Sequence, residues 1–243
     1  MSIVLEINKV SKFFGGLKAL REVSFSILSN EIVGLIGPNG AGKTTLINCI
    51  SGMLKPTRGA VKLRNKELTN LSPHDICRAG IGRTFQIPRP FLNMTIMENL
   101  TVVSRVEKQT LLYYLELLGL SSKRGFLAKN LTFQEMRKLE FTRALAVSPK
   151  VVLLDEIVAG LNPGETQEMV KLIKAIQQGL RISVLWVEHV MEAVMESSDR
   201  VIVLHEGAKI AEGFPKDIAN NDKVVEAYLG KEYIFKEGAK RFA

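Results

Sequence analysis

Apolar residues follow two different patterns along the chain. In the first thirty residues they alternate with polar residues, over 3–7 and again over 23–27. A period of two predicts half-buried strands, with the stretch FFGGLKAL (13–20) as the turn between them. Residues 61–68 predict another strand of this kind. The N-terminal part of the chain is therefore expected to be built from strands with one buried face.

Further along, continuous apolar runs alternate with segments of helical spacing. Runs without polar interruptions predict strands that are buried on both faces, and their alternation with helices predicts a parallel sheet covered on both sides. The predicted strands are 31–37, 150–156, 182–189 and 200–207, and the helices that follow the first three are 43–50, 164–177 and 190–197.

Residues 88–147 contain no convincing strand pattern. Apolar residues recur there at helical spacing over 95–103, 110–120 and 139–147, for example at Leu111 and Leu115. We therefore expect a helical insertion between strands of the main sheet.

The composition adds little to this picture. The chain of 243 residues has 46% apolar and 24% charged residues, which is ordinary for a globular protein. Its net charge of +8 suits a nucleotide, a nucleic acid or an acidic membrane face, and it suits simple solubility equally well. Charge alone leaves these alternatives open.

Cysteine usage and hydropathy bear on the compartment. Cys49 and Cys77 lack metal-ligand spacing, so both are expected to be buried thiols in a reducing compartment. The N-terminus lacks the layout of a signal peptide, and no apolar run approaches the roughly 18 residues of a membrane helix. We expect a cytoplasmic protein that meets a membrane only from the side or through another protein.

The stretch GLIGPNGAGKTT fits the phosphate-binding pattern G-x-x-x-x-G-K-[ST], with an apolar strand before it and a helix after it. Glycines allow backbone amides to turn toward a phosphate, and the helix adds unpaired N–H groups and the positive end of its dipole. Lys43 would reach the β- and γ-phosphates, and the Thr44 hydroxyl would hold Mg²⁺. The candidate nucleotide-binding residues are Gly37, Pro38, Asn39, Gly40, Ala41, Gly42, Lys43, Thr44 and Thr45.

Two carboxylates follow the apolar run VVLL. Asp155 suits a Mg²⁺ ligand, and Glu156 suits a group that orients or deprotonates an attacking water. An apolar strand that ends in two acids is common, so the alternative is a strand that simply finishes at the solvent. Its place in the same predicted sheet as the phosphate loop favours the catalytic interpretation.

The order of these motifs resembles the nucleotide-binding subunit of ATP-binding cassette (ABC) transporters over nearly the whole chain. The motifs are the phosphate loop, TFQ (84–86), the segment 130–145, LLDE, GLNP (160–163) and VEH. The resemblance implies an α/β fold: a P-loop NTPase core with a mainly parallel sheet, an N-terminal antiparallel β subdomain and a helical subdomain insertion. It also implies one ATP-binding domain over 1–243, with the helical subdomain at about 88–147, and binding of ATP and Mg²⁺.

Such domains pair head to tail, so that each ATP lies between one phosphate loop and the signature segment of the other chain. The family pattern Leu-Ser-Gly-Gly-Gln corresponds here to Leu131, Thr132, Phe133, Gln134 and Glu135. A glutamine in place of the second glycine obstructs the approach to a phosphate, and Glu135 adds negative charge. We expect asymmetry: this chain's own phosphate loop is competent, while the site that its signature completes is slow or inert. The alternative is a purely structural helix.

Three more residues carry over by resemblance, each with a plain alternative. Gln86 matches a glutamine that touches Mg²⁺ and the attacking water, although a loop glutamine is usually just solvated. His189 matches a histidine that contacts the γ-phosphate, although a histidine at a strand end is more often structural. Phe14 matches an aromatic residue that stacks on adenine, although it or Phe13 could be a core residue.

The Asn-Pro form of GLNP, the stretch 82–100 and the ending VVEAYLG are similar to importers of branched-chain and other hydrophobic amino acids. This branch implies a peripheral subunit on the cytoplasmic side of a prokaryotic membrane. Its partners would be transmembrane permease subunits, a second ATP-binding subunit (the same or a different chain) and, indirectly, a solute-binding protein, with no nucleic acid. Two alternatives stay open: a cassette ATPase that serves nucleic acid or the ribosome, and a non-hydrolysing regulatory subunit.

Overall fold

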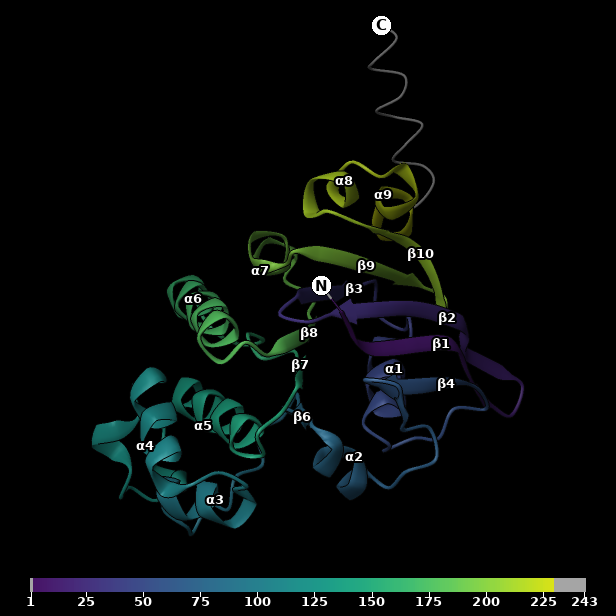
Figure 1. The fold of residues 1–243 in the computed structure, drawn as a ribbon. Helices are drawn as coiled ribbons and strands as arrows, with labels where there is room; N and C mark the ends of the chain where they lie inside the picture. Colours follow the sequence, from purple (N-terminus) through teal and green to yellow (C-terminus); the bar gives the residue numbers. More distant parts are fainter. Residues whose placement is uncertain (1, 230–243) are drawn as a thin grey trace, which may run out of the picture.

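A computed structural model of the chain describes residues 2–229. Its centre is a six-stranded sheet in the order β10-β9-β3-β8-β7-β6 (Figure 1). Strands β9 to β6 pair in parallel, and β10 pairs antiparallel to β9 at one edge. The mainly parallel sheet is therefore confirmed. The strands are β3 (Ile32–Ile36), β6 (Ile81–Arg83), β7 (Val151–Asp155), β8 (Ser183–Val187), β9 (Arg200–His205) and β10 (Ala208–Gly213).

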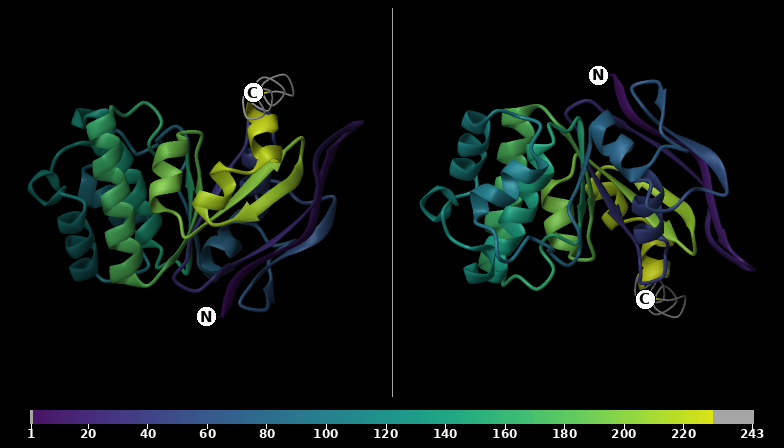
Figure 2. Two further views of the ribbon diagram at one scale, coloured as in Figure 1. Left: turned by 90° about the horizontal axis from the view of Figure 1, so that it is seen from above. Right: turned by 90° about the horizontal axis from the view of Figure 1, so that it is seen from below.

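Both faces of this sheet are covered. Because side chains alternate along a strand, Val152 and Leu154 of β7 join one hydrophobic cluster while Val151 and Leu153 join another. The first cluster lies under the helical insertion, and the second lies against α1 and the N-terminal strands. Figure 2 shows these two parts on opposite sides of the central sheet. Every residue of β3, β7 and β8 is buried, as their uninterrupted apolar character predicts.

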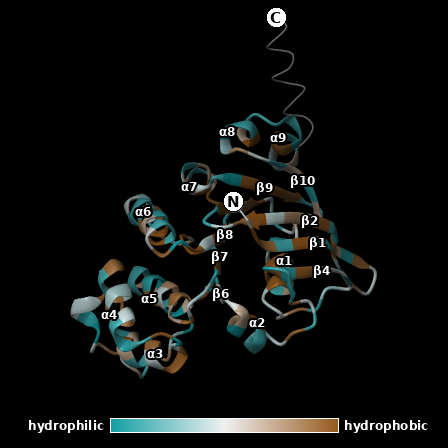
Figure 3. Ribbon diagram, in the orientation of Figure 1, coloured by the Kyte–Doolittle hydropathy of each residue, from teal (hydrophilic) through white to brown (hydrophobic). Residues whose placement is uncertain are grey.

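A second sheet of four antiparallel strands has the order β2-β1-β4-β5. Hydrophobic and hydrophilic segments alternate along β1 and β2 (Figure 3), as predicted. The antiparallel N-terminal part of the fold is thus confirmed. The strands are β1 (Ile3–Phe14), β2 (Leu17–Leu28), β4 (Arg58–Leu63) and β5 (Lys66–Glu67).

Two details of this sheet differ from the sequence prediction. The expected turn over 13–20 is only the pair Gly15–Gly16, because β1 and β2 stay paired up to Phe14 and Leu17. A two-residue connection of this kind needs positive φ, and Gly15 has φ +57°. The single strand expected over 61–68 is a hairpin instead, since Arg64 and Asn65 turn the chain with φ values of 45° and 66°.

The predicted helical insertion is confirmed. Over the range 88–147 the structure contains helices and short 3₁₀ turns, plus a single isolated bridge between Thr95 and Leu127. Leu111 and Leu115 are buried on one side of the middle helix, as their spacing predicts. The helices are α3 (Ile96–Val103), α4 (Lys108–Leu117) and α5 (Phe133–Ala146).

Helices also connect the strands of the central sheet. Predicted helix 43–50 is confirmed as α1 (Lys43–Ile50), and the two later ones as α6 (Pro163–Leu180) and α7 (Met191–Ser197). The strands β6 and β10 were not predicted, because β6 has only three residues and β10, AKIAEG, has no continuous apolar run. Three short helices were not predicted either. These helices are α2 (Pro73–Ala79), α8 (Pro215–Ala219) and α9 (Asp222–Leu229).

Of the two cysteines, Cys49 is buried as expected, but Cys77 on the short helix α2 is only partly buried. In the part of the chain that the structure describes, no helix is both long enough and apolar enough to cross a bilayer. The single domain over 1–243 stays a prediction, and the basic C-terminal residues 236–243 lie outside the described range.

Two isoleucines of β1 test the assignment of its buried face. Ile7 is 1% exposed in the core, whereas Ile3, expected on the same face, is 53% exposed because the register shifts between Ile3 and Leu5. Ile7→Ala should lower the free energy of unfolding by about 2–5 kcal/mol. The matched change Ile3→Ala should cost less than about 1 kcal/mol. Urea unfolding measures both, and equal losses would contradict the assignment.

Candidate functional site

The loop between β3 and α1 is shaped by glycines at left-handed positions. Gly37, Gly40 and Gly42 have φ values of 154°, 79° and 101°. A Cβ on Gly37 would lie 2.2 Å from the carbonyl oxygen of Leu204, and one on Gly42 would lie 2.7 Å from that of Ala19. These two glycines are thus required by close packing against neighbouring strands as well as by backbone conformation. Only Gly40 faces open space, as expected for a residue that approaches a ligand.

Helix α1 begins at Lys43 without a side-chain cap and without an acidic residue in its first turn. Its first N–H groups are therefore left to other acceptors, which favours an anion at this end. The Lys43 side chain is buried, and its ammonium donates to the carbonyl oxygens of Gly37 at 2.6 Å and Pro38 at 3.1 Å. Burial lowers the pKa of Lys43, and the carboxylates of Glu156 and Asp155 oppose this shift.

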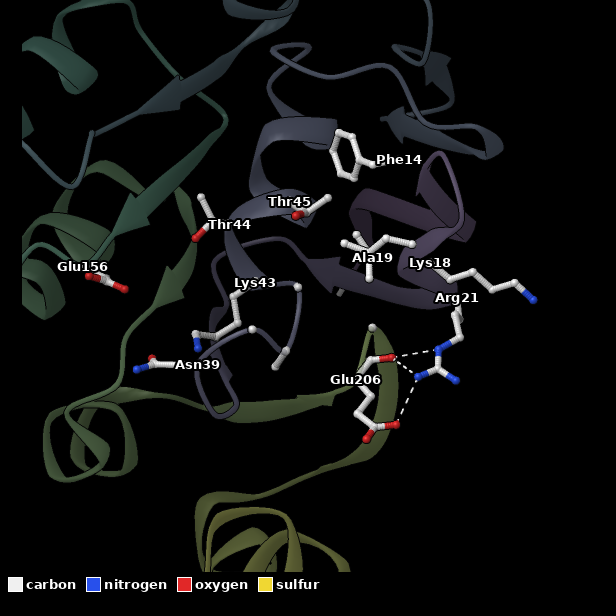
Figure 4. Close-up of a pocket in the computed structure, with 15 residues that line it drawn as sticks. Phe14, Lys18, Ala19, Arg21, Asn39, Lys43, Thr44, Thr45, Glu156 and Glu206 are labelled. Carbon is white, nitrogen blue, oxygen red and sulfur yellow. Dashed lines mark hydrogen bonds and ion pairs between the residues drawn. The ribbon is translucent and has the colours of Figure 1, made fainter.

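A cavity of about 570 Å³ lies over this loop. Residues 39–45 line the cavity. Gly37 and Pro38 are not part of its lining, and their carbonyl oxygens accept hydrogen bonds from the Lys43 ammonium. Figure 4 shows Glu156 at the left of the cavity and Phe14 at its upper side, above Thr45. The Phe14 ring is 46% exposed, so it is available for stacking, and the Lys12 ammonium lies 5.2 Å from its centroid. The volume is within the range of small-molecule sites.

The Glu156 carboxylate contacts side chains from two other segments of the chain. The amide Nε2 of Gln86 donates to Glu156 Oε2 at 2.6 Å, and Nδ1 of His189 lies 3.5 Å from Glu156 Oε1. These residues follow β6, β7 and β8, which are adjacent strands. The structure therefore brings together the three residues that the sequence singled out for hydrolysis. Glu156 itself has φ +50°, an unusual conformation for a residue with a side chain.

Asp155, one residue earlier, is 3% exposed and points into the protein. Arg83 donates to its Oδ2 at 3.0 Å and also to Asn48 Oδ1 and Ser51 Oγ, both at 2.7 Å. Burial raises the pKa of Asp155, and the Arg83 guanidinium opposes that shift. Sequence reasoning missed Arg83, although its place at the end of a strand just before TFQ marks it as a neighbour of the site.

The predicted Mg²⁺ ligands offer only oxygen atoms: the Thr44 hydroxyl, the Asp155 carboxylate and the Gln86 amide oxygen. The amide nitrogen of Gln86 is already engaged with Glu156, which leaves its oxygen for a cation. Hard oxygen donors of this kind fit Mg²⁺. Of the three residues only Thr44 lines the cavity, since Asp155 is buried against Arg83 and Gln86 lies beside Glu156. Among the described residues there is no cluster of three or more His, Cys, Asp or Glu side chains that would suit another metal.

Residues 20–159 match the ABC transporter family, and residues 208–234 match a second one described as branched-chain amino acid ATP-binding cassette transporter. The chain belongs to the ABC transporter ATP-binding proteins. Within that family it falls in the branched-chain amino acid branch, which confirms the resemblance deduced from its motifs.

Individual relatives support this family assignment. The branched-chain amino acid transport ATP-binding protein LivG of Escherichia coli is 39% identical, over 94% of this chain and 98% of that protein. BraF of Pseudomonas aeruginosa is 36% identical over the same shares. The crystal structure of an ATP-binding cassette in its ADP conformation superposes with a TM-score of 0.87 at 33% identity, covering 95% of this chain and 100% of that one. As a cassette of this family, the chain is an ATPase coupled to transport.

The signature segment of this cassette is tied to the chain's own side chains. Thr132 caps α5 by accepting from the backbone N–H of Glu135, whose carboxylate accepts from the N–H of Thr132. Gln134 Nε2 donates to Glu168 Oε2 at 2.9 Å, and Lys138 Nζ lies 2.6 Å from the other oxygen of Glu168. The glutamine that replaces glycine is thus held toward α6.

Two buried charges of the cassette were missed from sequence. Arg137 is 3% exposed on α5, and Glu188, the residue before His189, is fully buried. Burial raises the pKa of Glu188 to about 7. No sequence pattern distinguishes these charges from the many that face solvent, but the position of Glu188 at the end of an apolar strand is a weak signal.

The pKa of Glu188 makes a prediction about stability. Since burial raises it from 4.5 to about 7, ionisation of Glu188 costs the folded state increasingly as pH rises from 4.5 to 7, and the cost levels off above. Glu188→Gln keeps an acceptor for the Val158 N–H but removes the charge. We compare the free energy of unfolding of the variant with that of wild type by urea unfolding. The advantage of the variant should be roughly 2 kcal/mol larger at pH 8 than at pH 5. The exposed control Glu192→Gln should show no such difference between the two pH values.

Proposed function

We propose that this chain is the ATP-hydrolysing subunit of a membrane importer for branched-chain or other hydrophobic amino acids. The observation that carries the hydrolytic part is the convergence of Gln86, Glu156 and His189 at the end of the cavity over the phosphate loop. The cargo is supported by the family match at 208–234 and by the transport roles named for LivG and BraF.

In this proposal the triphosphate of ATP lies along residues 39–45, and the adenine stacks on Phe14. The Lys43 ammonium swings from its loop carbonyls to the β- and γ-phosphates. Glu156 accepts a proton from the attacking water, while Gln86 and His189 hold the carboxylate and the γ-phosphate in line. Mg²⁺, bound by Thr44, Asp155 and Gln86, would neutralise charge on the phosphate oxygens.

An exposed apolar surface supports the proposal of a permease partner. Apolar side chains crowd the segment around and after Gln86: Phe85, Ile87, Phe91 and Leu92 are between 40% and 67% exposed. Exposed apolar clusters of this kind favour a protein partner. We propose that the partner is a transmembrane permease subunit, which this chain would contact on the cytoplasmic side of a prokaryotic membrane. A second ATP-binding subunit would pair head to tail, and a solute-binding protein would act through the permease.

The pairing is expected to be asymmetric. Thr132 and Glu135 are committed to capping α5, and Gln134 adds a side chain where the family has glycine. The side of the dimer that receives this signature would turn over slowly, whereas this chain's own loop, with Glu156, would be completed by the partner's signature.

Two variants separate binding from hydrolysis. Lys43→Ala should weaken ATP binding by about 100-fold or more, because a charge-assisted contact to the phosphates is lost. Glu156→Gln should bind ATP within about threefold of wild type but lower kcat by about 100-fold or more and accumulate a closed dimer. Nucleotide titration, turnover and size-exclusion chromatography with ATP provide the measurements. Lys171→Ala, an exposed charge on α6, is the control. Normal turnover by Glu156→Gln would remove Glu156 from the mechanism.

The asymmetry makes its own prediction. Gln134→Gly should raise ATP turnover of the assembled complex, by up to roughly tenfold if one blocked contact is restored. Gln134→Ala, which removes the amide but keeps a Cβ, should gain less. Turnover that stays at the wild-type rate in both variants would show that Gln134 does not limit the second site.

A further inference from the structure

Arg137 is a buried cation that joins the signature helix to the catalytic loops of the same chain. It lies in the second turn of α5, and its guanidinium stacks on the Phe133 ring at 4.9 Å. Its two terminal nitrogens donate to different segments, Nη1 to the carbonyl of Phe85 at 3.4 Å and Nη2 to that of Ala159 at 3.2 Å. The planar fork of an arginine can span two acceptors in this way, and a lysine cannot.

Both acceptors adjoin the hydrolytic cluster. Phe85 precedes Gln86, whose amide donates to Glu156, and Ala159 follows Glu156 by three residues. Arg137 therefore holds the backbone on either side of the Gln86–Glu156 contact. The Phe133 ring also lies against the next residue of the loop, since a Cβ on Gly160 would be 3.3 Å from it.

Glu188 also contacts the loop that follows Glu156. Its Oε1 accepts from the N–H of Val158 at 2.9 Å, and it precedes His189. Its Oε2 is buried and makes no well-formed hydrogen bond among the described residues; the Trp186 side chain is close enough to help lower the Glu188 pKa, but its Nε1 does not form a hydrogen bond either. A buried carboxylate left half-satisfied is costly. Among the carboxylates around Arg137, Glu188 does most to oppose the lowering of the Arg137 pKa by burial, whereas for Glu188 itself the nearby charge that does most to lower the pKa is His189.

The loop between these two charges is strained. Glu156 occupies left-handed backbone space at φ +50°, a conformation that is unfavourable for a residue with a Cβ. Such a conformation persists only where the surroundings enforce it. Residues 158 and 159, just beyond it, are fixed by Glu188 and Arg137.

We propose that Arg137 and Glu188 are positioning residues for ATP hydrolysis, which hold the Glu156 loop and the Gln86 joint in register with the signature helix. The inference rests on the proposed function and deepens it. Through Phe133 and Arg137, a shift of the start of α5 against the partner's nucleotide moves Glu156 and Gln86 in this chain's own site. Occupancy of one site is thereby transmitted to the other.

The test uses Arg137→Met and Glu188→Gln in the full chain, with turnover measured on the membrane complex purified through a tag on this chain. Each variant should lower kcat about tenfold or more, because the attacking group is misplaced, while KM and the Kd for ATP stay within about threefold. The double variant should be no slower than the slower single variant, since the two charges act as a unit.

Arg200→Met is the matched control. Arg200 likewise pairs with a carboxylate and donates to a backbone carbonyl, through Glu31 Oε1 at 2.9 Å and the carbonyl oxygen of Ser26 at 2.6 Å. It begins β9, at the end of the sheet opposite the phosphate loop and Glu156. It should lose stability and keep kcat. A purely structural role for Glu188 predicts no loss of kcat in Glu188→Gln, which is expected to fold at least as stably as wild type at pH 8.

Wild-type kcat in both variants overturns the inference and leaves the proposed function intact. Equal losses in Arg137→Met and Arg200→Met, with kcat unchanged in Glu188→Gln, overturn it as well. Should Arg137→Met not fold, Glu188→Gln decides alone. A wild-type complex that neither binds nor hydrolyses ATP would refute the proposed function itself, and the inference with it.

Discussion

The site depends on the parallel pairing of β3, β8 and β7. The register sets Leu35 opposite Val187 and Val187 opposite Asp155, so these three strands end in one row. Whatever follows each strand is delivered to the same edge: the phosphate loop after β3, His189 after β8 and Glu156 after β7. A slip of one residue in any pair would exchange the side chains between the two hydrophobic clusters and separate these groups, so the hydrophobic core fixes the geometry of the site.

The same edge concentrates charge that the core does not favour. Four charged residues are buried there: Lys43, Asp155, Arg137 and Glu188. Burial shifts the pKa of each in the direction that favours its neutral form. Each has contacts that offset part of this cost, yet a core of apolar residues would be more stable. Their retention beside a strained Glu156 is consistent with a site in which stability is given up for position.

The main strands, the phosphate loop and the residues proposed for hydrolysis were predictable from the sequence, for physical reasons. Continuous apolar runs identified the buried strands, and the glycine pattern identified the loop at 37–45. The order of the motifs placed Gln86, Glu156 and His189 at one sheet edge, where they do meet. The family and its branch followed from the same motifs and are confirmed.

What escaped prediction depends on tertiary contacts. The close packing that requires Gly37 and Gly42 involves Leu204 and Ala19, far away in the sequence. Likewise, Arg83, Arg137 and Glu188 look like ordinary surface charges until the fold buries them. The contact of Gln134 with Glu168 could not be foreseen either, because it joins two helices that are separate in sequence.

The proposed mechanism requires that the backbone between residues 39 and 45 binds a triphosphate whose terminal group faces Glu156. A crystal structure of the chain with Mg²⁺ and a non-hydrolysable ATP analogue would show directly whether it does. We expect density for three phosphates along this loop, with Lys43 turned onto them and the last one beside Glu156 and His189. A nucleotide bound elsewhere, or an analogue absent at saturating concentration, would contradict it.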